Sequence, residues 1–296
     1  MIYIEPNAGV APVLTVLADA RHNINLNGYL LDNRAILAAL KAAHARGVDV
    51  RVMIEGKPYD MKPWQVKKEA AAIQAAGAIV RYAPPRFESH GSHWAFDHGK
   101  WVCSNHQCEI GSPNYTYAGF GSDRDYLVVT ANRQVVQAAN AVFNADWHNQ
   151  RAPAYAHQVL VLSPGSQPQL MRLLQQPGPL DIEAEEVGYA PAILNAIAAK
   201  GKLVRVIVPA NISSKDRRNL ENLQSHGVEV RFMPVHPLYV HAKMWVTNTM
   251  AFVGSENISK VSITDNREMG LLLGGRDIGI LQAQFNRDWA RAGASS

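Results

Sequence analysis

His241-Ala-Lys243, Gly254-Ser-Glu-Asn257 and Arg267-Glu268 form a stretch of sequence that occurs twice in this chain. The earlier copy reads His98-Gly-Lys100, Gly111-Ser-Pro-Asn114 and Arg124-Asp125. Each position of the later copy lies 143 residues after its counterpart, with no insertion or deletion between the blocks. Chance rarely produces such spacing, so the repeat predicts one active site built from two half-sites.

The pattern of strands and helices also repeats. In the first half we expect strands at 22–31, 48–54 and 78–82, with helices at 33–46 and 64–76. In the second half we expect strands at 180–187, 203–208 and 228–232, with helices at 191–199 and 214–225. This alternation predicts an α/β fold with mostly parallel sheets flanked by helices. We expect two duplicated halves, 1–150 and 157–296, with the active site at their interface.

Composition indicates an ordinary globular protein. The chain has 296 residues, of which 47% are apolar and 18% charged. A net charge of +4 suits a phosphate-bearing substrate, although it supports one only weakly. No apolar run is long enough for a membrane span, and no charged, apolar leader opens the chain, so we expect any export signal to be absent or already removed.

Cys103 and Cys108 are the two cysteines of the sequence, and four residues separate them. If those four residues form a hairpin loop, the cysteines face each other at a distance that a disulfide can bridge. A disulfide would favour a secreted or periplasmic setting over a cytoplasmic one. A pair of reduced core cysteines explains the same spacing equally well.

The repeated residue types suit phosphoryl chemistry. Residues two apart on a strand share a face, so the histidine and lysine of each copy point the same way. Imidazole can act as nucleophile or acid near neutral pH, lysine supplies positive charge, and an asparagine amide adds a donor. Two such sets match a tetrahedral anion with three non-bridging oxygens better than they match acyl transfer. The acid 27 residues after each histidine, Asp125 or Glu268, is expected to accept from its second ring nitrogen.

Neither a metal nor another cofactor is expected. The sequence has no CxxC or HExxH motif. His90, His93 and His98 could mimic a zinc cluster, but their spacing matches no such motif.

These motifs resemble those of the phospholipase D superfamily, whose signature is HxKx4D followed by GSxN, present twice. The resemblance implies a metal-independent attack of one histidine on phosphorus, giving a phosphohistidine, while the other histidine protonates the leaving oxygen. Order along the chain favours His98 as nucleophile and His241 as general acid, and the near symmetry keeps the reverse open. The side chains expected to hold the phosphoryl group are Lys100, Lys243, Asn114 and Asn257, with Ser112 and Ser255 as further substrate contacts.

The sequence departs from the family signature at one position in each copy. Asn105 and Asn248 stand where the family has aspartate five residues after the lysine. The turn that follows is also one residue shorter in both copies. Matching changes indicate a tighter turn, and we expect the site to be active.

The motifs do not choose between phosphodiester substrates. We favour a nuclease acting on single-stranded nucleic acid, because an insertion at 85–97 carries Arg86, Phe87, Trp94 and Phe96, which could stack bases. The same side chains could instead pack the loop against the protein. A phospholipase D or cardiolipin-synthase-like phosphatidyltransferase is the alternative, and a non-catalytic phosphate-binding protein is a third reading. The internal duplication makes a monomer the default expectation.

Overall fold

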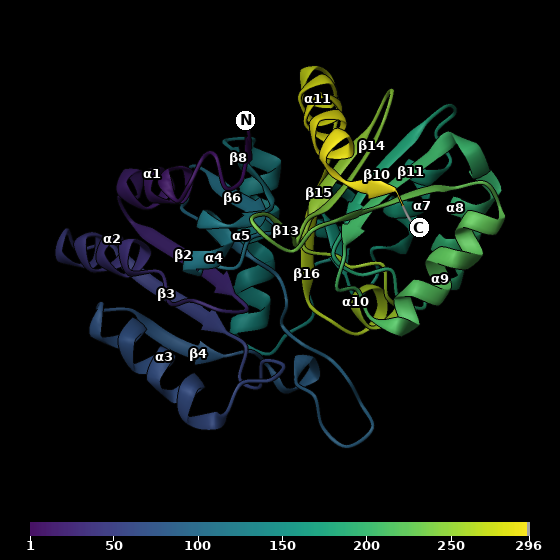
Figure 1. Ribbon diagram of the computed structural model, residues 1–296. Coiled ribbons are helices and arrows are strands. Elements are labelled where there is room, and N and C mark those ends of the chain that lie inside the picture. The colour runs from purple at the N-terminus through teal and green to yellow at the C-terminus, as the bar shows by residue number, and fades with distance from the viewer. Residues whose placement is uncertain (295–296) are drawn as a thin grey trace.

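The computed structural model describes residues 1–294, which form two sheets that lie side by side (Figure 1). The first sheet has the strand order β1 (Ile2–Ile4), β8 (Tyr126–Thr130), β6 (Cys108–Gly111), β5 (Trp101–Cys103), β2 (Asn23–Gly28), β3 (Asp49–Ile54) and β4 (Ile79–Tyr82). Its helices are α1 (Ala11–Asp19), α2 (Arg34–Ala45), α3 (Pro63–Ala75), α4 (Tyr117–Gly121) and α5 (Arg133–Trp147), with the 3₁₀ turn η1 (Pro85–Phe87).

Read from the opposite edge, the second sheet repeats this order and adds one strand, β17. Its strands are β17 (Gly293–Ala294), β12 (Glu229–Met233), β11 (Val204–Pro209), β10 (Leu180–Ala184), β14 (Lys243–Thr247), β15 (Ala251–Gly254), β16 (Glu268–Leu273) and β9 (Val161–Ser163). Its helices are α6 (Ala156–Val159), α7 (Gln167–Leu174), α8 (Pro191–Lys200), α9 (Ser214–Ser225), α10 (Lys260–Thr264) and α11 (Arg276–Arg291), with the 3₁₀ turn η2 (Gly201–Leu203). A separate two-stranded sheet joins β7 (Asp123–Arg124) to β13 (Tyr239–Val240).

The expected α/β class is confirmed, and each sheet is divided in the same way. Strands β2, β3 and β4 pair in parallel, as do β10, β11 and β12. The motif hairpins extend each sheet through antiparallel pairs, β5 with β6 in the first and β14 with β15 in the second. Within residues 1–294, no helix combines the length and the apolar character that crossing a membrane would need. The division into halves at 150–157 stays a prediction.

Local sequence sets the ends of the helices. The Asn33 side chain accepts hydrogen bonds from the amides of Ala35 and Ile36, which caps the start of α2. Gly47 then follows the helix with φ of +83°, a left-handed conformation that favours glycine. Strand β3 begins two residues later, so α2 is bounded by side-chain chemistry at one end and backbone freedom at the other.

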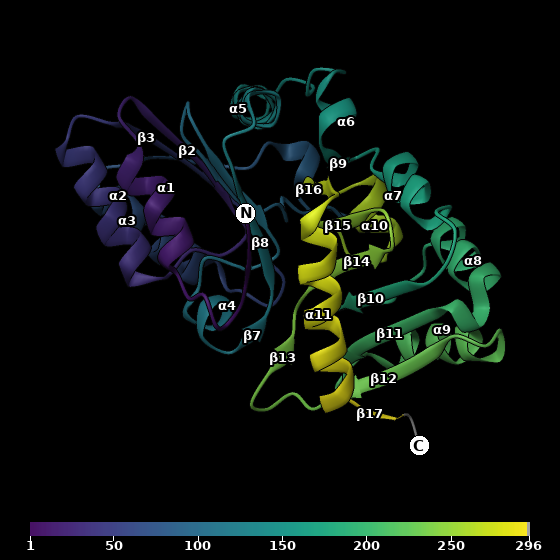
Figure 2. The same cartoon turned by 90° about the horizontal axis from the view of Figure 1, so that it is seen from above.

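One hydrophobic core is shared by both halves. Alternate residues of β5 point to opposite faces: Val102 packs towards α1 and α2, whereas Cys103 faces the other half. The core between the sheets also takes in Phe143 and Phe285. These residues belong to α5 and α11, the helices labelled in Figure 2. Cys103 and Cys108 are joined there as a buried disulfide. The two sheets are therefore held together by a continuous apolar interface.

Two buried ion pairs cross between the sheets. Arg124 beside β8 donates to both carboxylate oxygens of Asp288 in α11, at 2.8 and 3.1 Å. Arg267 beside β16 donates to both oxygens of Asp146 in α5, at 2.7 and 2.9 Å. All four side chains are buried. Because a buried charge without its partner is costly, these pairs fix how the sheets dock.

Asp288→Asn should destabilise the protein by about 3–5 kcal/mol, since Arg124 would remain buried with an uncompensated charge. Chemical denaturation measures the free energy of unfolding. Asp181→Asn is the matched control, because the Asp181–Arg205 pair has the same bidentate geometry with a partly exposed arginine. Asp181→Asn should lower the free energy of unfolding by only about 1 kcal/mol. Equal losses in the two variants would contradict a special role for the buried pair.

Candidate active site

The two His-Lys pairs meet at one cavity between the halves. Lys100 directly precedes β5, and Lys243 is the first residue of the equivalent strand β14. Each histidine precedes its lysine by two residues. A cavity of about 830 Å³ is lined by His98, His241 and both motif asparagines. The predicted half-sites therefore come together around a single space.

Backbone hydrogen bonds pair the segment before each histidine with a segment of the opposite half. Strand β13, which leads to His241, pairs in parallel with β7, and the amide of His241 donates to the carbonyl of Arg124 at 3.2 Å. In the other half-site, the backbones of Asp97 and Arg267 form an isolated parallel β-bridge, and the amide of His98 donates to the Arg267 carbonyl at 2.9 Å. Each histidine is thus docked beside the acidic segment of the opposite copy.

The histidine–acid pairs are consequently crossed. His98 Nδ1 lies 3.1 and 3.0 Å from the two oxygens of Glu268, and His241 Nδ1 lies 2.9 and 3.1 Å from those of Asp125. The expectation that each histidine pairs with the acid 27 residues after it is wrong. The acids are the predicted ones, but each serves the other copy. With Nδ1 donating to a buried carboxylate, Nε2 of each ring is left for chemistry.

Further hydrogen bonds hold the two acids. Asp125 accepts from the hydroxyl of Ser112, and Glu268 accepts from Ser262 Oγ at 2.8 Å and from Asn266 Nδ2 at 2.9 Å. Burial acts to raise the pKa of Glu268, but the interaction with His98, which includes its hydrogen bond, and the charge of Lys100 outweigh burial and hold that pKa below its usual range. Glu268 is therefore available as an ionised acceptor.

The lysines differ in their surroundings. The Lys100 ammonium donates to the carbonyl of His98 and lies 5.2 Å from the ring centroid of Tyr29. Lys243 donates to the carbonyl of His241 at 2.7 Å and to Glu185 Oε2 at 2.7 Å, and its Nζ lies 3.3 Å from His241 Nε2. One lysine therefore faces an aromatic ring and the other a carboxylate.

Burial tunes the first half-site. It lowers the pKa of His98 to about 4, with Lys100 and Lys243 acting in the same direction and Glu268 opposing them. Burial and the nearby charge of Lys243 also lower the pKa of Lys100 to about 7. Near neutral pH the His98 ring is therefore uncharged in the free protein, as a nucleophile must be.

The motif asparagines complete the set of donors around the cavity. Asn114 Nδ2 lies 3.5 Å from His241 Nε2. Asn257 lines the same cavity, and its backbone amide donates to Ser262 Oγ. The side-chain oxygens of both asparagines are buried without a hydrogen-bond partner among residues 1–294. Both carboxamides are thus placed to meet a bound group.

Four expected substrate contacts are wrong. Ser112 is buried and donates to Asp125, and Ser255 is buried and donates to the backbone of Met269, so both support the hairpins from behind. Arg86 binds Asp146 at 2.5 Å, and Phe87 is only 2% exposed, with Arg86 and Arg267 over its ring. Arg86 therefore holds the loop to α5, and Phe87 packs beneath the two guanidinium groups.

Trp94 and Phe96 do line the cavity, with Trp94 56% exposed. The sequence interpretation missed Tyr29, Tyr59, Glu185, Glu186 and Tyr189, which line it too. Glu185 and Glu186 directly follow β10, and β10 pairs with motif strand β14, so the carboxyl end of that strand was the available signal. Within residues 1–294, no cluster of three or more histidine, cysteine or acidic side chains is arranged to hold a metal ion.

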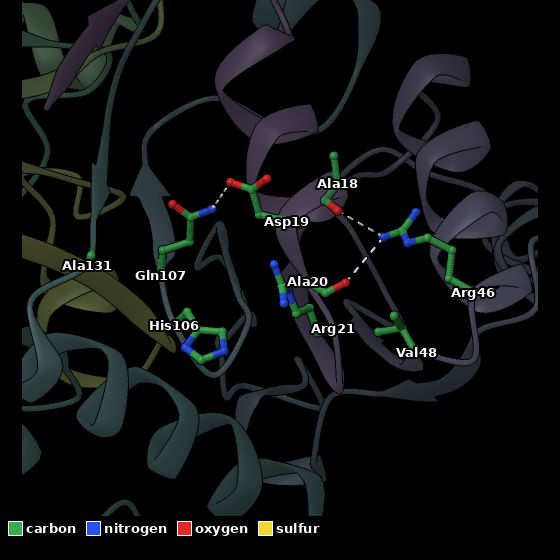
Figure 3. Close-up of a pocket in the computed structure, with 9 residues that line it drawn as sticks. All are labelled: Ala18, Asp19, Ala20, Arg21, Arg46, Val48, His106, Gln107 and Ala131. Atoms are coloured by element: carbon green, nitrogen blue, oxygen red, sulfur yellow. Dashed lines mark hydrogen bonds between the residues drawn. The ribbon is translucent and has the colours of Figure 1, made fainter.

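A second hollow of about 930 Å³ lies away from both histidines, between the end of α1 and the turn that joins β5 to β6 (Figure 3). Its Arg46 donates to the carbonyls of Leu17, Ala18 and Ala20, which caps the end of α1. Gln107 across the hollow donates to Asp19. None of the predicted site residues lines this hollow, whereas both motif histidines and both motif asparagines line the cavity between the halves.

The sequence matches the family described as "Cardiolipin synthase, PLD-like domain" over residues 13–147 and 189–289, which include both motif copies. The chain belongs to the phospholipase D superfamily. Members of this superfamily are phosphodiesterases and phosphotransferases.

Two relatives of the chain have names that describe different activities. The chain is 36% identical over 97 residues to the virion nicking-joining enzyme of Monkeypox virus and 29% identical over 122 residues to cardiolipin synthase A of Pseudomonas aeruginosa. These matches cover 30% and 40% of this chain and 23% of each relative. The chain thus spans about a quarter of the length of these relatives.

A solved structure shares the fold. Phosphatidylserine synthase of Haemophilus influenzae superposes with a TM-score of 0.70 at 12% sequence identity, over 99% of this chain and 87% of that one. At this identity the likeness shows the fold alone.

The crossed pairing predicts which histidine each acid affects. Glu268→Gln should lower the pKa of His98 further, because the Glu268 carboxylate raises it, and should leave the ring resonances of His241 unchanged. Histidine ring chemical shifts followed against pH by NMR measure this. Asp125→Asn is the reciprocal variant and should perturb His241. If Asp125→Asn instead moved the His98 resonances, the pairing would lie within each copy.

Proposed function

We propose that this protein is a metal-independent phosphodiesterase that works through a phosphohistidine and cleaves single-stranded nucleic acid. The observation that carries the proposal is the pair of histidines in one cavity, each with Nδ1 held by a buried carboxylate from the opposite copy. This leaves two Nε2 atoms for two proton-coupled displacements at one phosphorus.

In the proposed reaction, Nε2 of neutral His98 attacks phosphorus while the bond from phosphorus to the leaving oxygen breaks. His241 gives its Nε2 proton to that oxygen. Water then attacks the phosphohistidine, gives a proton back to His241, and releases His98. Lys100, Lys243 and the two asparagine amides stabilise charge on the non-bridging oxygens.

The rim of the cavity favours nucleic acid as the substrate. Tyr59, Trp94 and Tyr189 line it with exposed fractions of 74%, 56% and 58%. Lys215 and Lys260 lie on the rim as well. Exposed aromatic rings stack on bases of any sequence, and lysines bind the phosphate backbone. The similarity to a nicking-joining enzyme agrees with this choice.

A phosphatidyltransferase is the second candidate. The relative named cardiolipin synthase A and the description of the matched family favour it. The same aromatic side chains could sit at a lipid interface.

His98→Ala and His241→Ala should each lower the hydrolysis of bis(p-nitrophenyl) phosphate by at least ~10³-fold, because each removes a group that acts at the reacting atoms. Release of p-nitrophenolate is the measurement. His106→Ala, in the remote hollow, is the control and should keep full activity. EDTA should leave the wild type unchanged, and a wild type inactivated by EDTA would refute the metal-independent mechanism.

The acidic side of the pH profile should report His98. Its pKa is lowered to about 4, and only the neutral ring attacks, so kcat/KM should hold down to about pH 5 and fall as pH drops through about 4. The profile is measured with the same phosphodiester from pH 3 upwards. If kcat/KM instead fell around pH ~6.5, the ordinary pKa of an imidazole, the result would contradict the burial of the nucleophile.

Substrate class is tested by offering single-stranded DNA and RNA beside phospholipid vesicles. We expect the nucleic acids to be cleaved, and Trp94→Ala and Tyr189→Ala should each weaken their binding by roughly 5–100-fold, the value of one stacked base. Trp64→Ala is the matched control, since Trp64 on α3 is 61% exposed and does not line the cavity. Intact nucleic acid together with release of a lipid head group would establish the second candidate.

A further inference from the structure

The two half-sites differ in the side chain that lies beside each His-Lys pair. In the first sheet Asn27 pairs with Trp101, and in the second Glu183 pairs with Met244, which is the counterpart of Trp101 at the offset of 143. Two residues further along the chain, directly after β2 and β10 end, lie Tyr29 and Glu185. The same place beside each His-Lys pair therefore holds an aromatic ring in one half and a carboxylate in the other.

Glu185 lies against the second pair. Its Oε2 accepts from Lys243 at 2.7 Å and stands 3.6 Å from His241 Nε2, the ring nitrogen that faces away from Asp125. Tyr239 also donates to Glu185, at 3.5 Å. Burial acts to raise the pKa of Glu185, but the charges of His241 and Lys243 outweigh it and hold that pKa far below its usual range. A negative charge is thus fixed beside the reactive nitrogen of His241.

Tyr29 brings no such charge to the first pair. Its ring meets that of His98 edge-on with 4.8 Å between the centroids, and Lys100 Nζ lies 5.2 Å from its centre. The Tyr29 hydroxyl accepts from the amide of Tyr59 at 2.6 Å, and burial raises its pKa, so the phenol stays neutral. His98 therefore has an apolar neighbour where His241 has an anion.

The other groups that face the histidines are balanced between the copies. Each ring has one orienting carboxylate, Glu268 or Asp125, and one lysine two residues along its strand. Asp123 adds a more distant acidic group to the side of His241, and Lys243 adds positive charge to the side of His98. Asp123, and Lys243 through its effect on His98, act in the same direction as Glu185. Lys243 also lies 3.3 Å from His241 Nε2, where its charge opposes that of Glu185, and Glu185 Oε2 binds this same ammonium at 2.7 Å. The surroundings of the two rings therefore differ chiefly at Tyr29 and Glu185.

We propose that Glu185 and Tyr29 divide the roles of the two histidines: Glu185 keeps a proton on His241 for the leaving oxygen, and Tyr29 leaves His98 uncharged for attack on phosphorus. This inference rests on the proposed phosphodiesterase function. Both are positioning residues, because they act through the histidines and the lysines. Interchanging them should reverse the reaction, with His241 forming the bond to phosphorus and His98 donating the proton.

The first experiment locates the covalent adduct. Wild type and the double variant Tyr29→Glu/Glu185→Tyr are mixed with bis(p-nitrophenyl) phosphate, quenched in base within milliseconds, digested and mapped by mass spectrometry. We expect phosphohistidine on His98 in the wild type and on His241 in the double variant. An adduct that stays on His98 in an active double variant would overturn the proposal.

The second experiment uses the isosteric Glu185→Gln, which keeps an acceptor for Lys243 but removes the charge. The basic limb of kcat/KM, which reports the proton on His241, should move to lower pH by on the order of one unit, while the acidic limb of His98 stays in place. Glu221→Gln, an exposed carboxylate on α9, is the control and should move neither limb.

The outcomes separate the two proposals. A wild type that neither hydrolyses the phosphodiester nor forms an adduct would refute the proposed function itself. An active wild type whose basic limb is unchanged in Glu185→Gln would refute only the division of roles. If the double variant does not fold, this shift alone decides the question.

Discussion

The structure depends on a crossed contact between its two copies. Nδ1 of each catalytic candidate, His98 or His241, is held by the carboxylate of the opposite copy, Glu268 or Asp125. The backbone enforces this arrangement, because the segment before each histidine pairs with the segment before the opposite acid. A free half would present an unoriented imidazole and a buried carboxylate without its partner, which is costly. The reactive geometry is therefore a property of the docked pair of halves.

The same crossing recurs one layer further out. Residues directly before the two acids, Arg124 and Arg267, reach the last turns of α11 and α5 in the opposite halves. Around them the shared apolar core excludes water, which strengthens each charged contact. Docking, charge pairing and histidine orientation thus form together. A change in any one of them should alter the geometry of the side chains around the cavity.

The sequence predicted much of this because a constant offset is a constraint on three-dimensional structure. It predicted that both His-Lys pairs, both asparagines and both acids belong to one site, and the structure brings these side chains together. The alternation of strands and helices predicted the sheets. The sequence could not predict which acid serves which histidine, since pairing within a copy and pairing between copies need the same residues. Nor could it separate Phe87 from Trp94: both are aromatic residues of one loop, and only tertiary packing buries the first and exposes the second.

Near symmetry of the backbone explains how the two half-sites can differ. Asp125 is short and is reached by Ser112 of its own hairpin, whereas Glu268 extends further and is held by Ser262 and Asn266. Each half-site orients its acid with different side chains, while the strands keep the same register. Equivalent positions can therefore change chemistry without disturbing the fold. The proposed reaction needs one uncharged ring and one protonated ring. In a site with identical halves, only the position of the proton would distinguish the two rings. Under the proposed division of roles, Glu185 and Tyr29 supply that difference before substrate binds.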